Sequence, residues 1–208
     1  MSHSQAGHHL PDTTRLETFA DGVFAIAITL LVLEIKVPTL AETRGGLWPA
    51  LAGLWPSYVG YLMSFLTIGI MWVNHHAIFQ YVRRSDRRFL FANVFVLMGI
   101  AFVPFPTAVL AEHLPDPVTR NAAAVFLSAW YIVLAVLFNI VWHTGIQGGR
   151  LLRDNVHQEG LETITRRYRI GPISYVVTTA IAFVSAWASL AVFFVLAVFW
   201  ALSERADG

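Results

Sequence analysis

Two apolar stretches near the start of the chain contain side chains that could move protons or bind cations. The carboxylate of Asp21 lies inside the first stretch, and the imidazoles of His75 and His76 lie near the end of the second, beside Trp72. Because histidine titrates near neutral pH, a histidine held against a carboxylate would respond to pH. Asp21 and Arg15 are one candidate set of partners for the histidine pair in a buried network. A simple interfacial position of the pair is the alternative.

A metal site is the weakest interpretation of the histidine pair. Two adjacent histidines without further spaced histidines or carboxylates supply too few ligands, and the chain has no cysteine. The pattern also lacks a convergent set of nucleophile and base, which disfavours an enzyme. The sequence therefore predicts no metal ion and no other cofactor.

The elements that carry these residues are predicted to be membrane helices. Of the 208 residues, 56% are hydrophobic and 13% are charged, and the mean hydropathy is +0.60. Soluble domains carry roughly twice that share of charged residues. The net charge of +1 is spread over local groups without a continuous basic face, so nucleic acid is not an expected partner. The lipid bilayer is the expected surrounding.

Counting apolar stretches predicts the number of membrane crossings, because a helix needs about 20 mostly apolar residues to cross the hydrocarbon core. Four single spans are predicted: Arg15–Val37, about Leu47 to Phe79, about Phe89 to Ala111, and about Asn121 to His143. Pro104 and Pro106 predict a kink or an early stop in the third span.

The last apolar stretch, Ile170–Leu202, is too long for one straight span. We interpret it as a hairpin of two short helices that turns near Ser185–Ser189; one tilted helix with a buried continuation is the alternative. The preceding segment, Gln147–Arg169, is predicted to be a loop along the membrane interface. The fold prediction is an all-α polytopic membrane protein with six transmembrane helices over residues 15–203 and no soluble domain. Residues 1–14 are predicted to be a disordered cytosolic tail, and 204–208 a cytosolic C-terminal tail.

The distribution of basic residues predicts the orientation of the spans. With six spans and both ends inside, eleven of the fourteen basic residues fall on the cytosolic side, as the positive-inside rule requires. They are Arg15, Arg83, Arg84, Arg87, Arg88, Arg150, Arg153, Arg166, Arg167, Arg169 and Arg205. The pattern therefore favours an N-in, C-in topology.

The first span is too rich in charge for its length. Only twelve uncharged residues separate Asp21 from Glu34, and they cover about 18 Å as a helix. One of these carboxylates must then lie at membrane depth or face a water-filled vestibule, where charged groups tend to line the protein interior or a pathway. The alternative is that Arg15 and Asp21 mark the headgroup boundary.

A helical wheel divides the first span into faces. At 100° per residue, Ile26, Leu30 and Leu33 fall on one stripe with Thr29 beside it, and Asp21 projects to another side. Such a stripe is typical of a lipid-facing or core surface. From periodicity alone a pore-lining role is the less common interpretation.

The residues RLETFADGVFAIAITLLVLEIKVP resemble the first helix of the bacterial branch of the endolysosomal potassium channel family, the transmembrane protein 175 family. The family signature is an arginine, three residues, then Phe-Ser-Asp; Arg15, Phe19 and Asp21 match it, whereas Ala20 replaces the serine. The segments WPSYVGYLMSFLTIGIMWVNHHAIF and NVFVLMGIAFVPFPTAVLAEH resemble the family's second and third helices. The resemblance covers about the first 115 residues well, and beyond them rests mainly on span number and apolar character.

The resemblance implies a homotetrameric channel in the bacterial cell membrane that passes potassium and other monovalent cations. Carried over residue by residue, the family's apolar pore constriction falls on Ile26, Leu30 and Leu33, and the hydroxyl that favours potassium falls on Thr29. No TVGYG-like loop of backbone carbonyls is present, so weak selectivity is expected.

A different class of function stays open at this stage. Asp21 with His75 and His76 would suit the coupling site of a small proton-coupled secondary transporter. The chain shows no internal repeat, however, so inverted-repeat transporter architecture gains no support.

Overall fold

The computed structural model describes residues 10–154, 156 and 158–203, and all regular elements in this part of the chain are helices. The long helices are α1 (Thr14–Leu30), α3 (Trp55–Tyr81), α4 (Arg87–Ala101), α5 (Pro104–His113), α6 (Arg120–Ile146), α7 (Gln158–Val184) and α8 (Ala186–Ser203). The short elements are α2 (Leu47–Gly53) and the 3₁₀ turns η1 (Leu31–Glu34), η2 (Glu42–Gly45) and η3 (Gln147–Gly149). The all-α prediction is confirmed.

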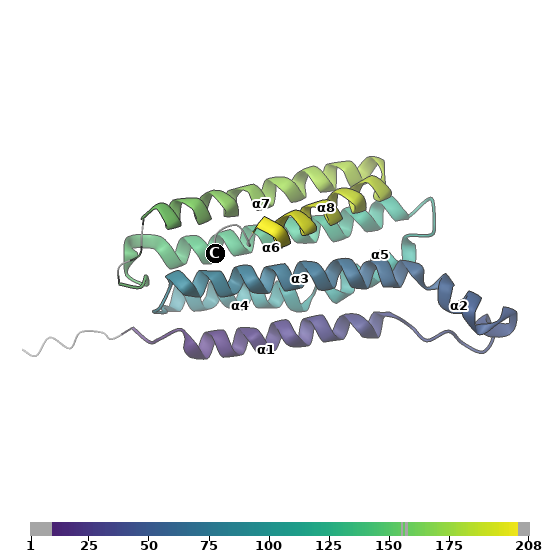
Figure 1. The fold of residues 1–208 in the computed structure, drawn as a ribbon, viewed down its shortest axis with the longest axis horizontal. Helices are drawn as coiled ribbons and strands as arrows, with labels where there is room; N and C mark the ends of the chain where they lie inside the picture. The colour runs from purple at the N-terminus through teal and green to yellow at the C-terminus, as the bar shows by residue number, and fades with distance from the viewer. Residues whose placement is uncertain (1–9, 155, 157, 204–208) are drawn as a thin grey trace, which may run out of the picture.

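The long helices lie side by side along one axis, and the chain direction reverses from each crossing to the next (Figure 1). α4 and α5 together make one crossing, and α2 lies beyond one end of the bundle. We call the end with the start of α1 and residues 82–86 the proximal end, and the opposite end, with Ser185, the distal end. This alternation places successive loops at opposite ends.

Within the described part of the chain, four helical segments are long and apolar enough to cross a membrane, as expected for a polytopic membrane protein. They are Thr14–Glu34, Trp55–Tyr81, Arg87–His113 and Arg120–Gly149, and Ala186–Val198 is a shorter apolar helix. The first four predicted spans therefore correspond to helices of the structure.

Proline determines where two of the helices begin. α4 ends at Ala101 and α5 begins at Pro104, so the predicted interruption of the third span is present. Proline lacks the N–H of a helical hydrogen bond and fits best in a first turn. Pro56 likewise stands in the first turn of α3, which separates α3 from the short α2. The predicted span from Leu47 to Phe79 is thus two helices.

The predicted C-terminal hairpin is present, with its turn at Ser185 between α7 and α8. The prediction of a loop over Gln147–Arg169 is wrong for residues 158–169, which form the first half of α7. α7 packs along α6, where the Trp142 Nε1–H donates to Thr165 Oγ1 over 2.9 Å and the Trp142 ring stacks on Tyr168. These contacts stabilise a helix whose local sequence is polar. The first arm of the hairpin is therefore a long helix and not a short one.

Three segments join at the proximal end through backbone hydrogen bonds; we call Pro11–Thr13, Val82–Ser85 and Leu151–Arg153 the proximal clasp. Thr13 N–H donates to the Arg83 carbonyl and Ser85 N–H to the Pro11 carbonyl, over 3.1 and 2.9 Å. Arg83 N–H donates to the Leu151 carbonyl over 2.9 Å.

The hydrogen bonds of the clasp involve residues that the sequence predicts to belong to a disordered tail, residues 1–14. The part of that prediction covering residues 1–9 lies outside the described residues, as does the tail over 204–208. Residues 11–13 are hydrogen-bonded to the bundle and Thr14 begins α1, so the prediction is wrong for this part.

Candidate functional site

α1 presents one face to the rest of the bundle. Its buried residues recur every three or four positions and pack towards α3 and α4. They are Leu16, Ala20, Phe24, Ala27 and Leu31. Ala20, which replaces the serine of the family signature, is fully buried. A small side chain at this position fits the close approach of the helices.

The stripe of branched apolar residues lies away from this buried face. Ile26, Leu30 and Leu33 are 59%, 41% and 70% exposed in the single chain. In the most apolar 18-residue stretch of Thr14–Glu34, 28% of the residues are buried, against 44–56% in the corresponding stretches of the other three spans. α1 is therefore the least covered of these four spans, and its uncovered surface includes all three residues.

Thr29 is exposed beside the stripe. Its hydroxyl donates to the carbonyls of Ala25 and Ile26 in its own helix, both over 2.9 Å. A hydroxyl has one proton and two lone pairs, so this arrangement leaves the oxygen free to accept. Thr29 can thus offer an oxygen ligand to a cation.

Asp21 lies on another side of α1 and is joined to α3. The Trp72 Nε1–H donates to Asp21 Oδ1 over 2.8 Å, and the Trp72 ring stacks on His76 at 6.3 Å between ring centroids. The structure therefore brings Asp21, Trp72 and His76 into one cluster, and this cluster fixes the rotation of α1 relative to α3.

His75 points into the bundle, away from this cluster. It is 2% exposed, its Nε2 lies 2.9 Å from Asn93 Oδ1 of α4, and its ring contacts Phe24 of α1. Among the described residues, no hydrogen bond or ion pair joins either histidine to Asp21 or Arg15. The expected network thus divides into a Trp72 cluster and a separate pair of His75 and Asn93.

The remaining signature residues, Arg15 and Phe19, are exposed, and Phe19 is 58% accessible. Both lie towards the same side of α1 as Ile26 by helical periodicity. Across the described part of the chain, no group of three or more histidine or acidic side chains could hold a metal ion.

Sequence reasoning missed Asn93 as a partner of His75. The signal is a single amide in the apolar stretch of α4, and buried amides require partners. Asn93 also donates to the Phe89 carbonyl over 2.8 Å, so its orientation is fixed.

Comparisons with known proteins place this arrangement among channels. A family model described as the endosomal/lysosomal potassium channel TMEM175 matches residues 15–104. A potassium channel of Chamaesiphon minutus is 48% identical over 203 residues, which are 94% of this chain and 96% of that protein. A potassium channel of Streptomyces collinus is 45% identical over 193 residues, 93% of each protein. The similarity thus extends well beyond the first 115 residues.

Solved structures agree with the fold. The crystal structure of a lysosomal potassium-selective channel TMEM175 homologue from Chamaesiphon minutus has a TM-score of 0.85 and 45% identity. It matches 94% of this chain and 98% of that chain. A crystal structure of the potassium channel MtTMEM175 has a TM-score of 0.61 at 17% identity over 94% of this chain and 91% of that chain, and supports the fold alone.

Proposed function

Because the chain belongs to the TMEM175 family, a family of ion channels and not of enzymes, we propose that it is a potassium-permeable, weakly selective cation channel. Four copies surround a pore lined by α1 of each subunit. Potassium and other monovalent cations pass through it down their gradients.

The observation that carries the proposal is the uncovered apolar stripe of α1. In the most apolar 18-residue stretch of Thr14–Glu34, only 28% of the residues are buried by their own chain, which leaves this face of α1 available to other copies in the membrane. Ile26, Leu30 and Leu33 from several copies, facing one axis, form a hydrophobic constriction that gates by dewetting. Opening then requires α1 to rotate or to move away from the axis.

Selectivity rests on Thr29. Its hydroxyl proton is committed to the α1 backbone, so the lone pairs are available to a partly hydrated cation. Hydroxyl oxygens at this position favour the less strongly hydrated potassium ion only modestly, because they do not replace a full hydration shell.

The bond between Trp72 and Asp21 supports a positioning role for the signature motif. It holds α1 against α3 on one side, while the stripe stays free on another. A proton-coupled carrier that uses Asp21 with His75 and His76 has less support, because His75 bonds Asn93 instead of Asp21.

The orientation in the cell membrane is N-in, C-in with six spans, α7 and α8 being the last two. The proximal end, which carries Arg83, Arg84, Arg150 and Arg153, is then cytosolic. Since the chain has no cysteine, a single cysteine introduced at Arg84 or at Thr43 can report on which side of the membrane that position lies. A membrane-impermeant maleimide added outside should label Thr43→Cys and not Arg84→Cys; the reverse pattern would invert the topology.

The pore proposal is tested by recording currents from purified protein in a planar bilayer. Ile26→Ser is compared with Ile140→Ser, since Ile140 is also exposed, at 45%, but belongs to α6. Ile26→Ser should raise conductance or open probability, and Ile140→Ser should leave both unchanged. Parent-like currents from Ile26→Ser would remove α1 from the pore.

The test of the carrier alternative is a flux measurement. Vesicles loaded with potassium and containing the parent protein should release it without a proton gradient. Release that requires a proton gradient would favour the carrier.

A further inference from the structure

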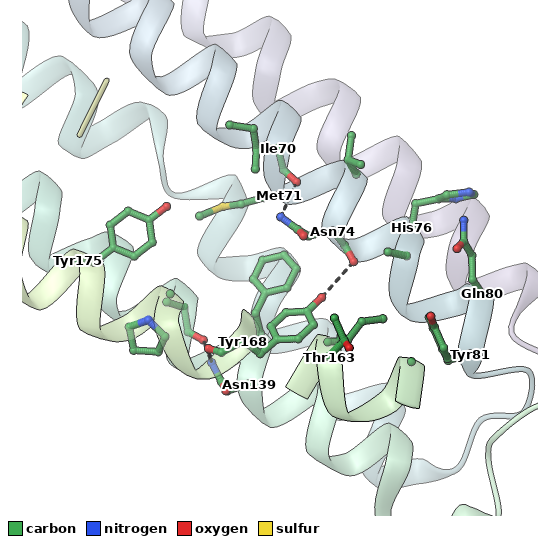
Figure 2. A pocket seen from close by; sticks show the side chains of 18 residues that line it. Ile70, Met71, Asn74, His76, Gln80, Tyr81, Asn139, Thr163, Tyr168 and Tyr175 are labelled. Carbon is green, nitrogen blue, oxygen red and sulfur yellow. Dashed lines mark hydrogen bonds between the residues drawn. The ribbon is translucent and has the colours of Figure 1, made fainter. Parts of the chain in front are cut away.

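A cavity of about 630 Å³ lies between α3, α6 and α7, away from α1. Its volume falls within the range of about 300–1,000 Å³ that small-ligand sites occupy. Figure 2 shows α3 and α7 on opposite sides of it. Ala135, Phe138 and Asn139 of α6 line it as well.

Small residues and one proline keep the cavity open. Gly171 would place a Cβ in open space, with no atom within 4 Å. The next residue, Pro172, stands inside α7 and also lines the cavity. The Tyr168 hydroxyl spans the gap and donates to the Asn74 carbonyl of α3 over 3.1 Å (Figure 2). The two walls are therefore joined across the cavity by a hydrogen bond.

The lining changes in polarity along the bundle axis. Ile70, Met71 and Tyr175 lie towards the middle of the bundle, whereas His76 and Gln80 lie towards the proximal end (Figure 2). The cavity thus has an apolar inner part and a proximal mouth rich in hydrogen-bonding groups.

The length of the cavity matches one leaflet of a bilayer. Ile70 and Gln80 are ten residues apart on α3, which corresponds to about 15 Å along a helix. The hydrocarbon core is about 30 Å thick. The cavity therefore runs from one interface to about the bilayer midplane.

An arginine lies beside the proximal mouth. Arg153 Nη2–H donates to the Phe79 carbonyl over 3.2 Å, next to the wall residues Gln80 and Tyr81. Of the arginines of the proximal clasp, Arg83 pairs with Asp12, whereas Arg84 and Arg153 take part in no ion pair among the described residues. Unpaired arginines at a membrane interface attract anionic headgroups.

We propose that this cavity binds an anionic phospholipid of the surrounding membrane, with one acyl chain between α3 and α7 and the headgroup at the proximal mouth. Polarity, length and charge each point to this occupant. The inference concerns a site away from α1 and does not rest on the proposed pore, since its test is a binding measurement.

The test uses a phosphatidylglycerol that carries a diazirine in one acyl chain. Parent protein is reconstituted in vesicles that contain this lipid, illuminated, and digested for peptide mapping by mass spectrometry. Labelling is expected on the segments 70–77 and 171–175. Excess phosphatidylglycerol should compete for these sites better than excess phosphatidylcholine.

Two variants fill the cavity from opposite walls. Gly171→Leu extends a side chain into the cavity from α7, and Ala77→Phe extends one from α3. If one of the two variants fails to fold, the other still tests the proposal. Gly69→Leu is the matched control, because Gly69 of α3 also has open space at its Cβ but does not line the cavity. A variant counts as folded if it elutes from a size-exclusion column at the same volume as the parent protein.

Labelling of the cavity segments should be lost in each folded filling variant and kept in Gly69→Leu. The proposal is wrong if these segments stay unlabelled while other lipid-facing helices are labelled, or if labelling survives in the filling variants. Equal competition by phosphatidylcholine would contradict the proposed preference for an anionic headgroup.

Discussion

The side-chain amide of Asn139 donates to the carbonyl of Tyr168 over 2.7 Å, which joins α6 to α7. That carbonyl lies four residues before Pro172, and proline has no N–H to offer it. Asn139 thus replaces a missing hydrogen bond of α7 with one from its neighbour. This hydrogen bond from Asn139 allows α7 to continue as a single helix past its proline.

Asn139→Leu should destabilise the protein by about 1–3 kcal/mol, because a backbone carbonyl inside the membrane loses its donor. In a Pro172→Ala background the same change should cost less, since the introduced alanine supplies the missing backbone N–H. Midpoints of thermal unfolding for the four members of this cycle measure the difference. An equal loss in both backgrounds would contradict the role of Pro172.

Trp72→Phe should weaken the attachment of α1 to α3, because it removes the indole N–H and keeps an aromatic ring. Asp21→Asn should behave like the parent in this respect, as an amide oxygen still accepts. Asp21→Ala should resemble Trp72→Phe. Open probability in bilayer recordings is the measurement, and an Asp21→Asn channel as altered as Asp21→Ala would show that charge matters instead of the bond.

Asn121 joins the start of α6 to the turn between α7 and α8. Its Oδ1 accepts from Ala186 N–H over 2.9 Å, and its Nδ2–H donates to the Val184 carbonyl over 3.3 Å. Asn121→Ala should loosen this turn by about 1 kcal/mol. Asn121→Asp keeps the oxygen that accepts from Ala186 and should therefore destabilise the turn less than Asn121→Ala does. Limited proteolysis at Ser185 measures the difference, and equal cleavage rates in parent and Asn121→Ala would rule out the role.

Local pattern was enough to predict most of the apolar helices and the two sides of α1. The periodicity of Ile26, Leu30 and Leu33, and the different side assigned to Asp21, follow from helix geometry alone. The exposure of the stripe agrees with that division. Its meaning as a pore stays a proposal.

Contacts between distant segments could not be predicted in the same way. The helical state of residues 158–169 depends on Trp142 and Tyr168 stacking across helices, and the local sequence is polar enough to resemble a loop. The place of Pro11–Thr13 depends on backbone groups, which leave no mark on side-chain pattern. Asn93 became the partner of His75 only through the packing of α4 on α3.

The proximal clasp should loosen in acid. Hydrogen bonds from the Thr14 hydroxyl and backbone N–H hold the pKa of Asp12 below its ordinary value of 3.8, and Arg83 lowers it further. Because the folded-state pKa is depressed, the stabilisation is present above 3.8 and is lost as pH falls through the folded-state pKa. The protection of the Thr13 and Ser85 amides from hydrogen exchange, taken relative to the intrinsic exchange rate at each pH, should therefore fall as pH drops through this range.

Asp12→Asn is the control for the clasp, because an amide does not titrate. In that variant the protection of the Thr13 amide should not change as pH falls through the range in which Asp12 titrates in the parent protein. A parent-like acid response in Asp12→Asn would assign the effect to another group, such as Asp86, which pairs with Arg150 at the same end.

The oxygen of Thr29 provides the sharpest test of selectivity. Thr29→Val keeps the shape of the side chain and removes both lone pairs, whereas Thr29→Ser keeps the hydroxyl. The permeability ratio of potassium to sodium should fall towards unity in Thr29→Val and stay near that of the parent in Thr29→Ser. Thr18→Val is the matched control, because the Thr18 hydroxyl also donates within α1, to the Thr14 carbonyl, but lies about three turns earlier. Reversal potentials under bi-ionic conditions measure the ratio. A ratio that Thr29→Val leaves unchanged, or that Thr18→Val lowers equally, would remove Thr29 from the selectivity of the pore.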